Sequence, residues 1–153
     1  MPSVTPRHLA CTLLLAIPAA LSAQSGRAAP TPSAAVEEFM RALADSNLTR
    51  MAQLFGNAKG AAAKTGQPKD YEKRIIIMQA MLHGVQAQAL GDVPGQKTGT
   101  RTVTTRLAHN GCTVTIPVNV AHAKEGWLVE EFNLTNAAVV NKPCETSRRP
   151  GTR

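Results

Sequence analysis

Apolar residues in the first half of the chain recur every three or four positions, which is the period of an amphipathic α-helix. Residues 33–43 predict a first helix with Thr31 or Ser33 as its N-cap. Residues 48–55 continue the period as a shorter second helix. The apolar face of the first helix consists of Val36, Phe39, Met40 and Leu43.

A third helix is predicted over residues 71–82, after Asp70 as a cap. Its apolar surface is broad and consists of Tyr71, Ile75, Ile76, Ile77, Met78, Met81 and Leu82. Three consecutive isoleucines also suit a strand, but the following Gln-Ala-Met favours a helix. Because so broad a surface must be covered, we expect this helix to pack against a sheet.

From Val85 onward the apolar period changes to two, which is typical of β-strands. Asn110-Gly111 is a strong signal for a hairpin turn. Pro117 indicates an edge position or a bulge, since proline cannot donate to a sheet ladder. The alternating segments are 85–89, 102–109, 112–120 and 127–134, and turn chemistry dominates 91–100.

The last of these strands changes phase in its middle. Trp127 and Val129 share one face of the strand. Phe132 and Leu134 fall on the opposite face. A bulge near residues 130–131 would place all four apolar side chains inside, because an extra residue reverses the alternation.

Helices followed by consecutive strands predict an α+β fold, with N-terminal helices packed on a curved, mainly antiparallel four-stranded sheet. Two segments carry a family resemblance: AVEEFMRALADSNLTRMAQLF at 35–55 and KEGWLVEEF at 124–132. With the hairpin-rich second half, they resemble the nuclear transport factor two-like superfamily. The resemblance covers roughly residues 33–136. It implies a cone-shaped, cystatin-like α+β domain, assigned to 33–140, and function only by analogy.

The N-terminal segment is typical of an export signal. Arg7 and His8 precede an uncharged apolar run, and Ala23 offers a small residue for cleavage. We therefore expect a signal peptide at 1–23, a linker at 24–32 and a secreted or periplasmic mature protein without a transmembrane segment. The C-terminal tail, 141–153, is expected to be tied down by Cys144 and otherwise disordered.

Cysteine usage agrees with an oxidising compartment. Cys11 lies inside the apolar run, and His8 stands where a lipoprotein signal would carry leucine, so lipidation is not expected. Cys112 and Cys144 remain as a pair, which predicts a disulfide stabilising the fold by roughly 3–4 kcal/mol. No Cys-x-x-Cys or His-x-x-x-His spacing indicates zinc, and we expect no metal and no cofactor.

The chain is basic, with 17 Lys+Arg against 10 Asp+Glu. The excess of positive charge is explained by the solubility it gives the protein, and the more specific alternative is attraction to an anionic cell envelope. The segment 56–69 is read as a mobile basic loop that carries Lys59, Lys64 and Lys69. With one Trp, one Tyr and three Phe, the chain offers no evident platform for stacking nucleic-acid bases.

Enzymes of the resembled superfamily place acids, Tyr or His inside the cone. In this chain Tyr71 adjoins Asp70, and neighbouring residues on a helix do not converge on one point. A pair of His122 with Glu131 is the one acid–base candidate, and Glu130 or Glu131 points inward unless a bulge turns both out. We expect no catalytic residues.

The expected ligand pocket is the inside of the cone, with Trp127 packed against the first and third helices. Its lining is predicted to include Phe39, Met40, Tyr71, Met78, Trp127 and Glu131. The predicted function is an exported, non-catalytic domain that binds a small apolar ligand or a protein partner, with a homodimer through the sheet left open. The alternatives are an isomerase- or hydratase-like enzyme using a pocket carboxylate or His, and an envelope-associated factor with a basic surface.

Overall fold

The computed structural model describes residues 27–142 and residue 144. The expected signal peptide and nearly all of the expected tail lie outside the described residues. The helices are α1 (Pro32–Ala44), α2 (Leu48–Leu54), α3 (Ala62–Thr65), α4 (Tyr71–Leu82), α5 (Leu134–Ala137) and the 3-10 helix η1 (Ala138–Asn141). The strands are β1 (Gly56–Asn57), β2 (Gly60–Ala61), β3 (Gln86–Pro94), β4 (Thr100–His109), β5 (Cys112–Ala123) and β6 (Gly126–Phe132).

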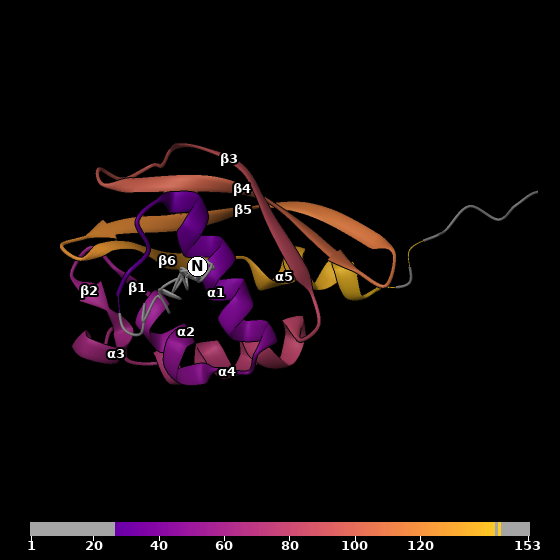
Figure 1. The fold of residues 1–153 in the computed structure, drawn as a ribbon, viewed down its shortest axis with the longest axis horizontal. Coiled ribbons are helices and arrows are strands. Elements are labelled where there is room, and N and C mark those ends of the chain that lie inside the picture. The colour runs from indigo at the N-terminus through magenta and orange to yellow at the C-terminus, as the bar shows by residue number, and fades with distance from the viewer. Residues whose placement is uncertain (1–26, 143, 145–153) are drawn as a thin grey trace, which may run out of the picture.

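The main sheet has four antiparallel strands in the order β3-β4-β5-β6. Asn110 and Gly111 join β4 to β5 with φ of 48° and 79°, the positive values that a tight hairpin turn requires. Helix α1 packs against all four strands, α2 contacts both α1 and β6, and α4 packs on α1 and α2 (Figure 1). The predicted α+β fold, with N-terminal helices packed on an antiparallel four-stranded sheet, is confirmed.

Two bulges shape the sheet. In β6 the pairing passes from Val120↔Val129 to Asn119↔Glu131, so Glu130 is the extra residue. The predicted bulge is therefore confirmed, and it returns Phe132 to the buried face that Val129 occupies. In β3 the extra residue is Leu90, and the strand continues to Pro94.

The turn expected at 91–100 is therefore shorter than predicted, because four of its residues continue β3 beyond the bulge. Leu134 was also misplaced, since it lies at the start of α5 rather than in the last strand. Pro117 pairs with Thr104 of β4, one residue before the β5–β6 ladder begins at Val118. At Pro117, β5 therefore pairs with β4 alone, so this residue occupies a local edge position, as predicted.

Helix α4 does not pack on the sheet as expected. Its buried residues Ile75, Met78 and Leu82 form one stripe, and the helix packs mainly on α1 and α2. Ile76 and Ile77 keep 53% and 38% of their surface exposed. The expectation was wrong because α1 already covers the inner face of the sheet, so α4 forms a further layer (Figure 1).

The segment 56–69 is not the structureless loop that its composition suggested. It contains the small β1–β2 hairpin and α3. A Cβ on Gly56 would clash with the carbonyl oxygen of Gly60, so the hairpin depends on that glycine. The Ala62 N–H also donates to the Phe55 carbonyl oxygen over 2.7 Å. Backbone contacts of this kind leave no apolar period in the sequence, which is why the prediction missed them.

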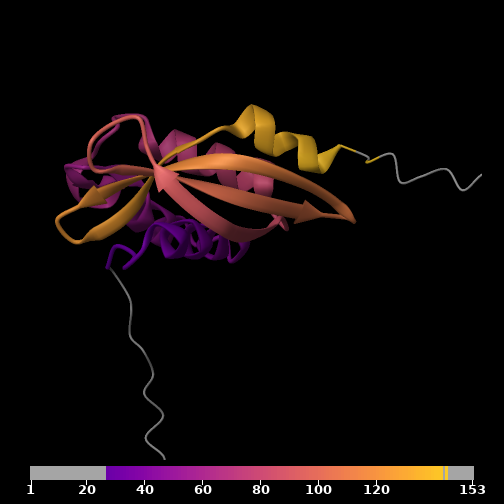
Figure 2. The ribbon, with the colours of Figure 1, turned by 90° about the horizontal axis from the view of Figure 1, so that it is seen from above.

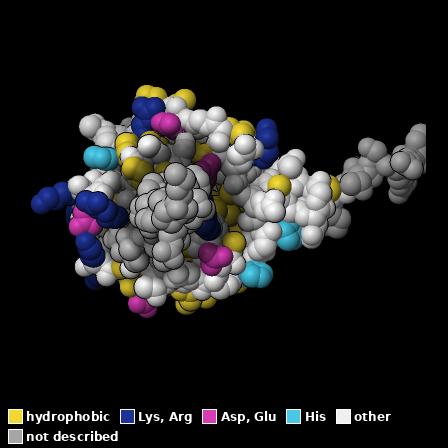
Figure 3. Space-filling model, viewed as in Figure 1, with side chains coloured by type: hydrophobic (Ala, Val, Ile, Leu, Met, Phe, Trp, Pro, Cys, Tyr) yellow, Lys and Arg dark blue, Asp and Glu magenta, His cyan; other side chains and the backbone are white. Residues whose placement is uncertain are grey.

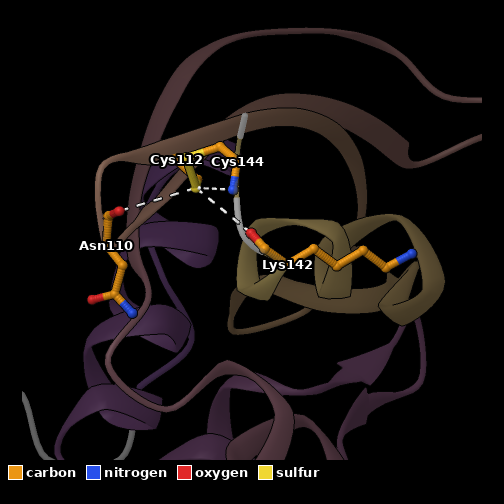
Figure 4. The surroundings of a disulfide bond; sticks show 4 residues. All are labelled: Asn110, Cys112, Lys142 and Cys144. Carbon is orange, nitrogen blue, oxygen red and sulfur yellow. Dashed lines mark hydrogen bonds between the residues drawn. A yellow bond between two sulfur atoms is a disulfide. The ribbon is translucent and has the colours of Figure 1, made fainter. Parts of the chain in front are cut away.

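Cys112 and Cys144 form the predicted disulfide, with Cα atoms 5.5 Å apart (Figure 4). Cys112 opens β5, and Cys144 follows η1, so the bond ties the chain after the last helix to the hairpin end of the β4–β5 pair. The Cys144 N–H also donates to the Cys112 Sγ over 3.1 Å. Figure 2 shows α5 and η1 extending from the sheet toward this point.

The outer edge of β6 is covered by short backbone contacts. Ala29 and Trp127 exchange two hydrogen bonds, of 3.1 and 2.8 Å, and Phe55 bridges to Val129. Ala29, within the segment expected as a linker, is only 1% exposed. Among residues 27–142 and 144, no helix combines the length and apolar character that crossing a membrane needs.

Candidate functional site

Three of the expected pocket residues fill the core. Phe39, Met40 and Met78 are 0%, 3% and 3% exposed. Phe39 lies tilted against the ring of Phe55, with centroids 6.3 Å apart. These side chains occupy the space between the sheet and the helices, where the cone was expected to hold a ligand.

Trp127 lies half-buried near one end of the core. Its nearest aromatic partner is His122, with ring centroids 4.8 Å apart. His122 itself is exposed, and it pairs across the β5–β6 ladder with Trp127. The backbone of Ala29 also pairs with Trp127, and sequence reasoning missed this contact because it involves no side-chain pattern.

The two strand carboxylates lie on the polar side of the sheet. Glu131 accepts from Asn119 Nδ2 over 3.2 Å, and Glu130 lies 3.6 Å from Lys97 Nζ. With neighbouring threonines they line a polar hollow of about 260 Å³. The bulge at Glu130 keeps Glu131 opposite Asn119, away from the buried face.

The structure does not bring the suggested acid–base pairs together. His122 is on the sheet face that Trp127 shares, whereas Glu131 is on the opposite face. Asp70 pairs instead with Arg74 Nε at 2.9 Å, which lowers the pKa of Asp70. The Tyr71 hydroxyl donates to Glu72 Oε1 over 3.1 Å. An oriented base needs a partner converging on the same substrate atom, and these contacts supply none.

Tyr71 instead borders a groove between α2, α3 and α4. The groove has a volume of about 370 Å³. Its walls are mainly apolar, with polar groups from Thr49, Tyr71 and Glu72. Leu48 and Ile76, which line it, remain 39% and 53% exposed. The lining residues are Leu48, Thr49, Ala52, Ala63, Tyr71, Glu72, Ile75 and Ile76, and we call this the α2–α4 groove.

Local sequence explains how the groove forms. Asn47 caps α2 by accepting from the Arg50 N–H over 2.9 Å, which fixes the start of the helix beside Leu48. Ile75 of α4 is buried beneath the groove, and Ile76, one position on, faces its opening. The hydrogen bond to Glu72 raises the pKa of Tyr71 above 10.0, so the phenol is neutral at physiological pH.

Within the described part of the chain, no group of three His, Cys, Asp or Glu is placed to hold a metal ion. No model of a known protein family matches the chain, and a search of curated proteins finds no match.

Proposed function

We propose that this protein is a non-catalytic binding domain that holds a small apolar ligand in the α2–α4 groove. The observation that carries the proposal is the groove itself, about 370 Å³ in volume and walled by Leu48, Ile75 and Ile76. Small-molecule sites have volumes of roughly 300–1,000 Å³, with mostly apolar walls and a few polar groups.

The partial exposure of the groove's walls supports a bound ligand. Leu48 and Ile76 leave apolar surface in water on two different helices that face the same hollow. Covering such surface stabilises a complex by roughly 25 cal/mol per Å². The Tyr71 hydroxyl and the Glu72 carboxylate at the rim provide the polar groups that would orient a ligand.

The proposed family is the nuclear transport factor two-like superfamily. It is supported by the order of the elements, in which three main helices precede a four-stranded antiparallel sheet. In this chain Phe39 and Met78 fill the interior, so the proposed ligand site lies outside the cone, between helices. Residence in a secreted or periplasmic compartment remains part of the proposal. The Cys112–Cys144 disulfide supports it, because such bonds persist where thiols are oxidised.

A neutral fluorescent apolar probe, Nile red, tests the groove. Ile76→Ser removes part of its wall, whereas Ile77→Ser changes the next residue of α4, which is also exposed and does not line the groove. We expect saturable Nile red binding that Ile76→Ser weakens by about 3–10-fold. Ile77→Ser should leave binding unchanged.

Equal losses in the two variants would show that the probe binds general apolar surface, and the proposal would be wrong. Absence of saturable binding to the parent protein would contradict it as well. Because both isoleucines are exposed, both variants should fold, and a thermal melt of each protein verifies this.

A further inference from the structure

A second hollow lies at the opposite side of α3, between the β1–β2 hairpin and the β5–β6 turn. It has a volume of about 200 Å³. Its apolar floor consists of Ala28, Ala61, Ala123 and Leu128, and the exposed Ala58 lies at its edge. Ala61, Ala123 and Leu128 form a small buried cluster of their own, separate from the main core. We call this hollow the lysine pocket because three lysines line it: Lys59, Lys64 and Lys124.

The rim of the lysine pocket carries more positive than negative charge. Lys64 Nζ contacts both carboxylate oxygens of Glu125, at 2.6 and 2.8 Å, and this ion pair joins α3 to the β5–β6 turn. No ion pair involves Lys59 or Lys124 within residues 27–142 and 144. Figure 3 shows Lys and Arg side chains gathering at the end of the molecule where β1, β2 and α3 lie.

The pKa of Glu125 reflects the same excess of positive charge at the rim. The hydrogen bond from Lys64 and the charge of that lysine lower the pKa of Glu125, and Lys124 and Arg27 lower it further. Three cations, Lys64, Lys124 and Arg27, therefore act on this single carboxylate. A second carboxylate or a similar anion at this rim would meet an attractive potential, which the chain's net charge of +7 extends.

We propose that the lysine pocket binds a small organic anion whose short apolar chain rests on the alanine and leucine floor. The volume, below that of a drug-sized site, limits the ligand to a small molecule. The anionic group meets Lys59 and Lys124 and competes with Glu125 for Lys64. This site is separate from the α2–α4 groove, so the failure of one proposal leaves the other standing.

Amide chemical shifts of Ala61, Ala123 and Leu128 follow the pocket directly in a titration of the full chain. The probes are hexanoate, the neutral hexanol and inorganic phosphate. We expect hexanoate to shift these amides saturably and to bind more tightly than either of the other probes. Binding should weaken with added salt, since the Debye length falls from about 10 Å at 0.1 M to about 3 Å at 1 M.

Substitutions at the rim should act in opposite directions. Lys124→Ala should weaken hexanoate binding by about 2–5-fold, as expected for a partly exposed charge contact. Glu125→Gln should tighten it by a similar factor, because it removes the internal competitor for Lys64. Lys73→Ala is the matched control, since Lys73 is an exposed lysine of α4 that does not line the pocket, and it should change nothing.

Any one of four results would overturn the proposal. If hexanol bound as tightly as hexanoate, the positive charge would have no role in binding. If phosphate bound as tightly as hexanoate, the apolar floor would have no role. Weaker binding by Glu125→Gln would show that Glu125 helps to hold the ligand instead of competing with it. Shifts that never saturate would show that no site exists.

Discussion

Tyr71 and Glu72 show how one contact sets the chemistry of a single side chain at the proposed groove. The phenol donates to Glu72 Oε1, and this hydrogen bond raises the pKa of Tyr71 above its ordinary value of 10.0. A raised pKa means that the contact stabilises the fold below pH 10.0. That contribution is lost as the pH rises through the higher pKa of the folded state.

Tyr71 is the only tyrosine in the chain, so the absorbance of its phenolate measures this pKa without assignment. We expect the titration midpoint above 10.0 in the parent protein and a lower midpoint in Glu72→Gln, which removes the charged acceptor. Glu125→Gln removes a carboxylate that does not contact Tyr71, so it is the control and should leave the midpoint unchanged. A parent midpoint at or below 10.0 would contradict the contact.

Glu125 behaves in the opposite sense, because Lys64 stabilises its charged form and lowers its pKa below 4.5. The ion pair therefore contributes to stability at neutral pH, and the contribution is lost as the pH falls through the lowered pKa. NMR titration of the Glu125 carboxyl carbon should give a midpoint below 4.5, and Lys64→Ala should raise it. An unchanged midpoint in Lys64→Ala would show that the pair does not persist in solution.

Among the elements, β6 is held in part by backbone contacts that its pattern of apolar and polar side chains does not predict. Gly126, with φ of 135°, opens the strand, and a Cβ there would lie 2.5 Å from the Ala29 carbonyl oxygen. Gly99 also has positive φ, 76°, but a Cβ there would meet nothing within 4 Å. Alanine substitutions at Gly99 and Gly126 therefore separate the free-energy cost of a positive φ from the cost of the steric clash with Ala29.

We predict that Gly99→Ala costs roughly 1–3 kcal/mol, the usual range for a strained backbone conformation. Gly126→Ala should cost more, because it also displaces Ala29 and breaks two backbone hydrogen bonds to Trp127. Urea denaturation of both variants measures the difference. Equal costs would mean that the Ala29 bridge adds nothing to stability.

The sequence predicted the elements whose side chains follow a period. The apolar faces of α1, α2 and α4, the hairpin at Asn110-Gly111 and the bulge at Glu130 could all be read in advance, because a period or a turn residue marks each of them. The β1–β2 hairpin and the Ala29 bridge could not be, since backbone hydrogen bonds hold both.

The α2–α4 groove could be predicted from the sequence only in part. All of its wall residues except Ala63 appeared in the predicted helices, and Tyr71 was among the expected pocket residues. Their meeting place depends on how α2 and α4 pack, and a periodic pattern specifies a helix face without naming its neighbour. For the same reason Phe39 and Met78, expected in the pocket, lie in the core.

At the scale of the whole molecule, the disulfide joins β5 to the chain that follows η1 across 32 residues. Replacing both cysteines by serine should destabilise the fold by roughly 3–4 kcal/mol, because the unfolded chain regains the entropy of the open loop. Chemical denaturation of the parent and the Cys112→Ser/Cys144→Ser protein measures this. A loss near zero would show that the fold does not rely on the bond.

Helix α4 packs on α1 and α2, α2 touches the main sheet at β6, and the proposed ligand site lies between α2 and α4 (Figure 1). Ligand binding there would change the outer helical layer and leave the β3–β6 sheet undisturbed. This separation distinguishes the groove from the core between the sheet and the helices, which Phe39, Met40 and Met78 occupy.

The most direct test of the groove as the ligand site is an amide NMR titration of the protein with hexanol, a small neutral apolar probe. The groove predicts saturable shifts concentrated in residues 48–52 of α2 and 71–76 of α4, and Ile76→Ser should reduce them while Ile77→Ser does not. Saturable shifts centred on the buried faces of β4, β5 and β6 would place the ligand in the core between the sheet and the helices and contradict the account.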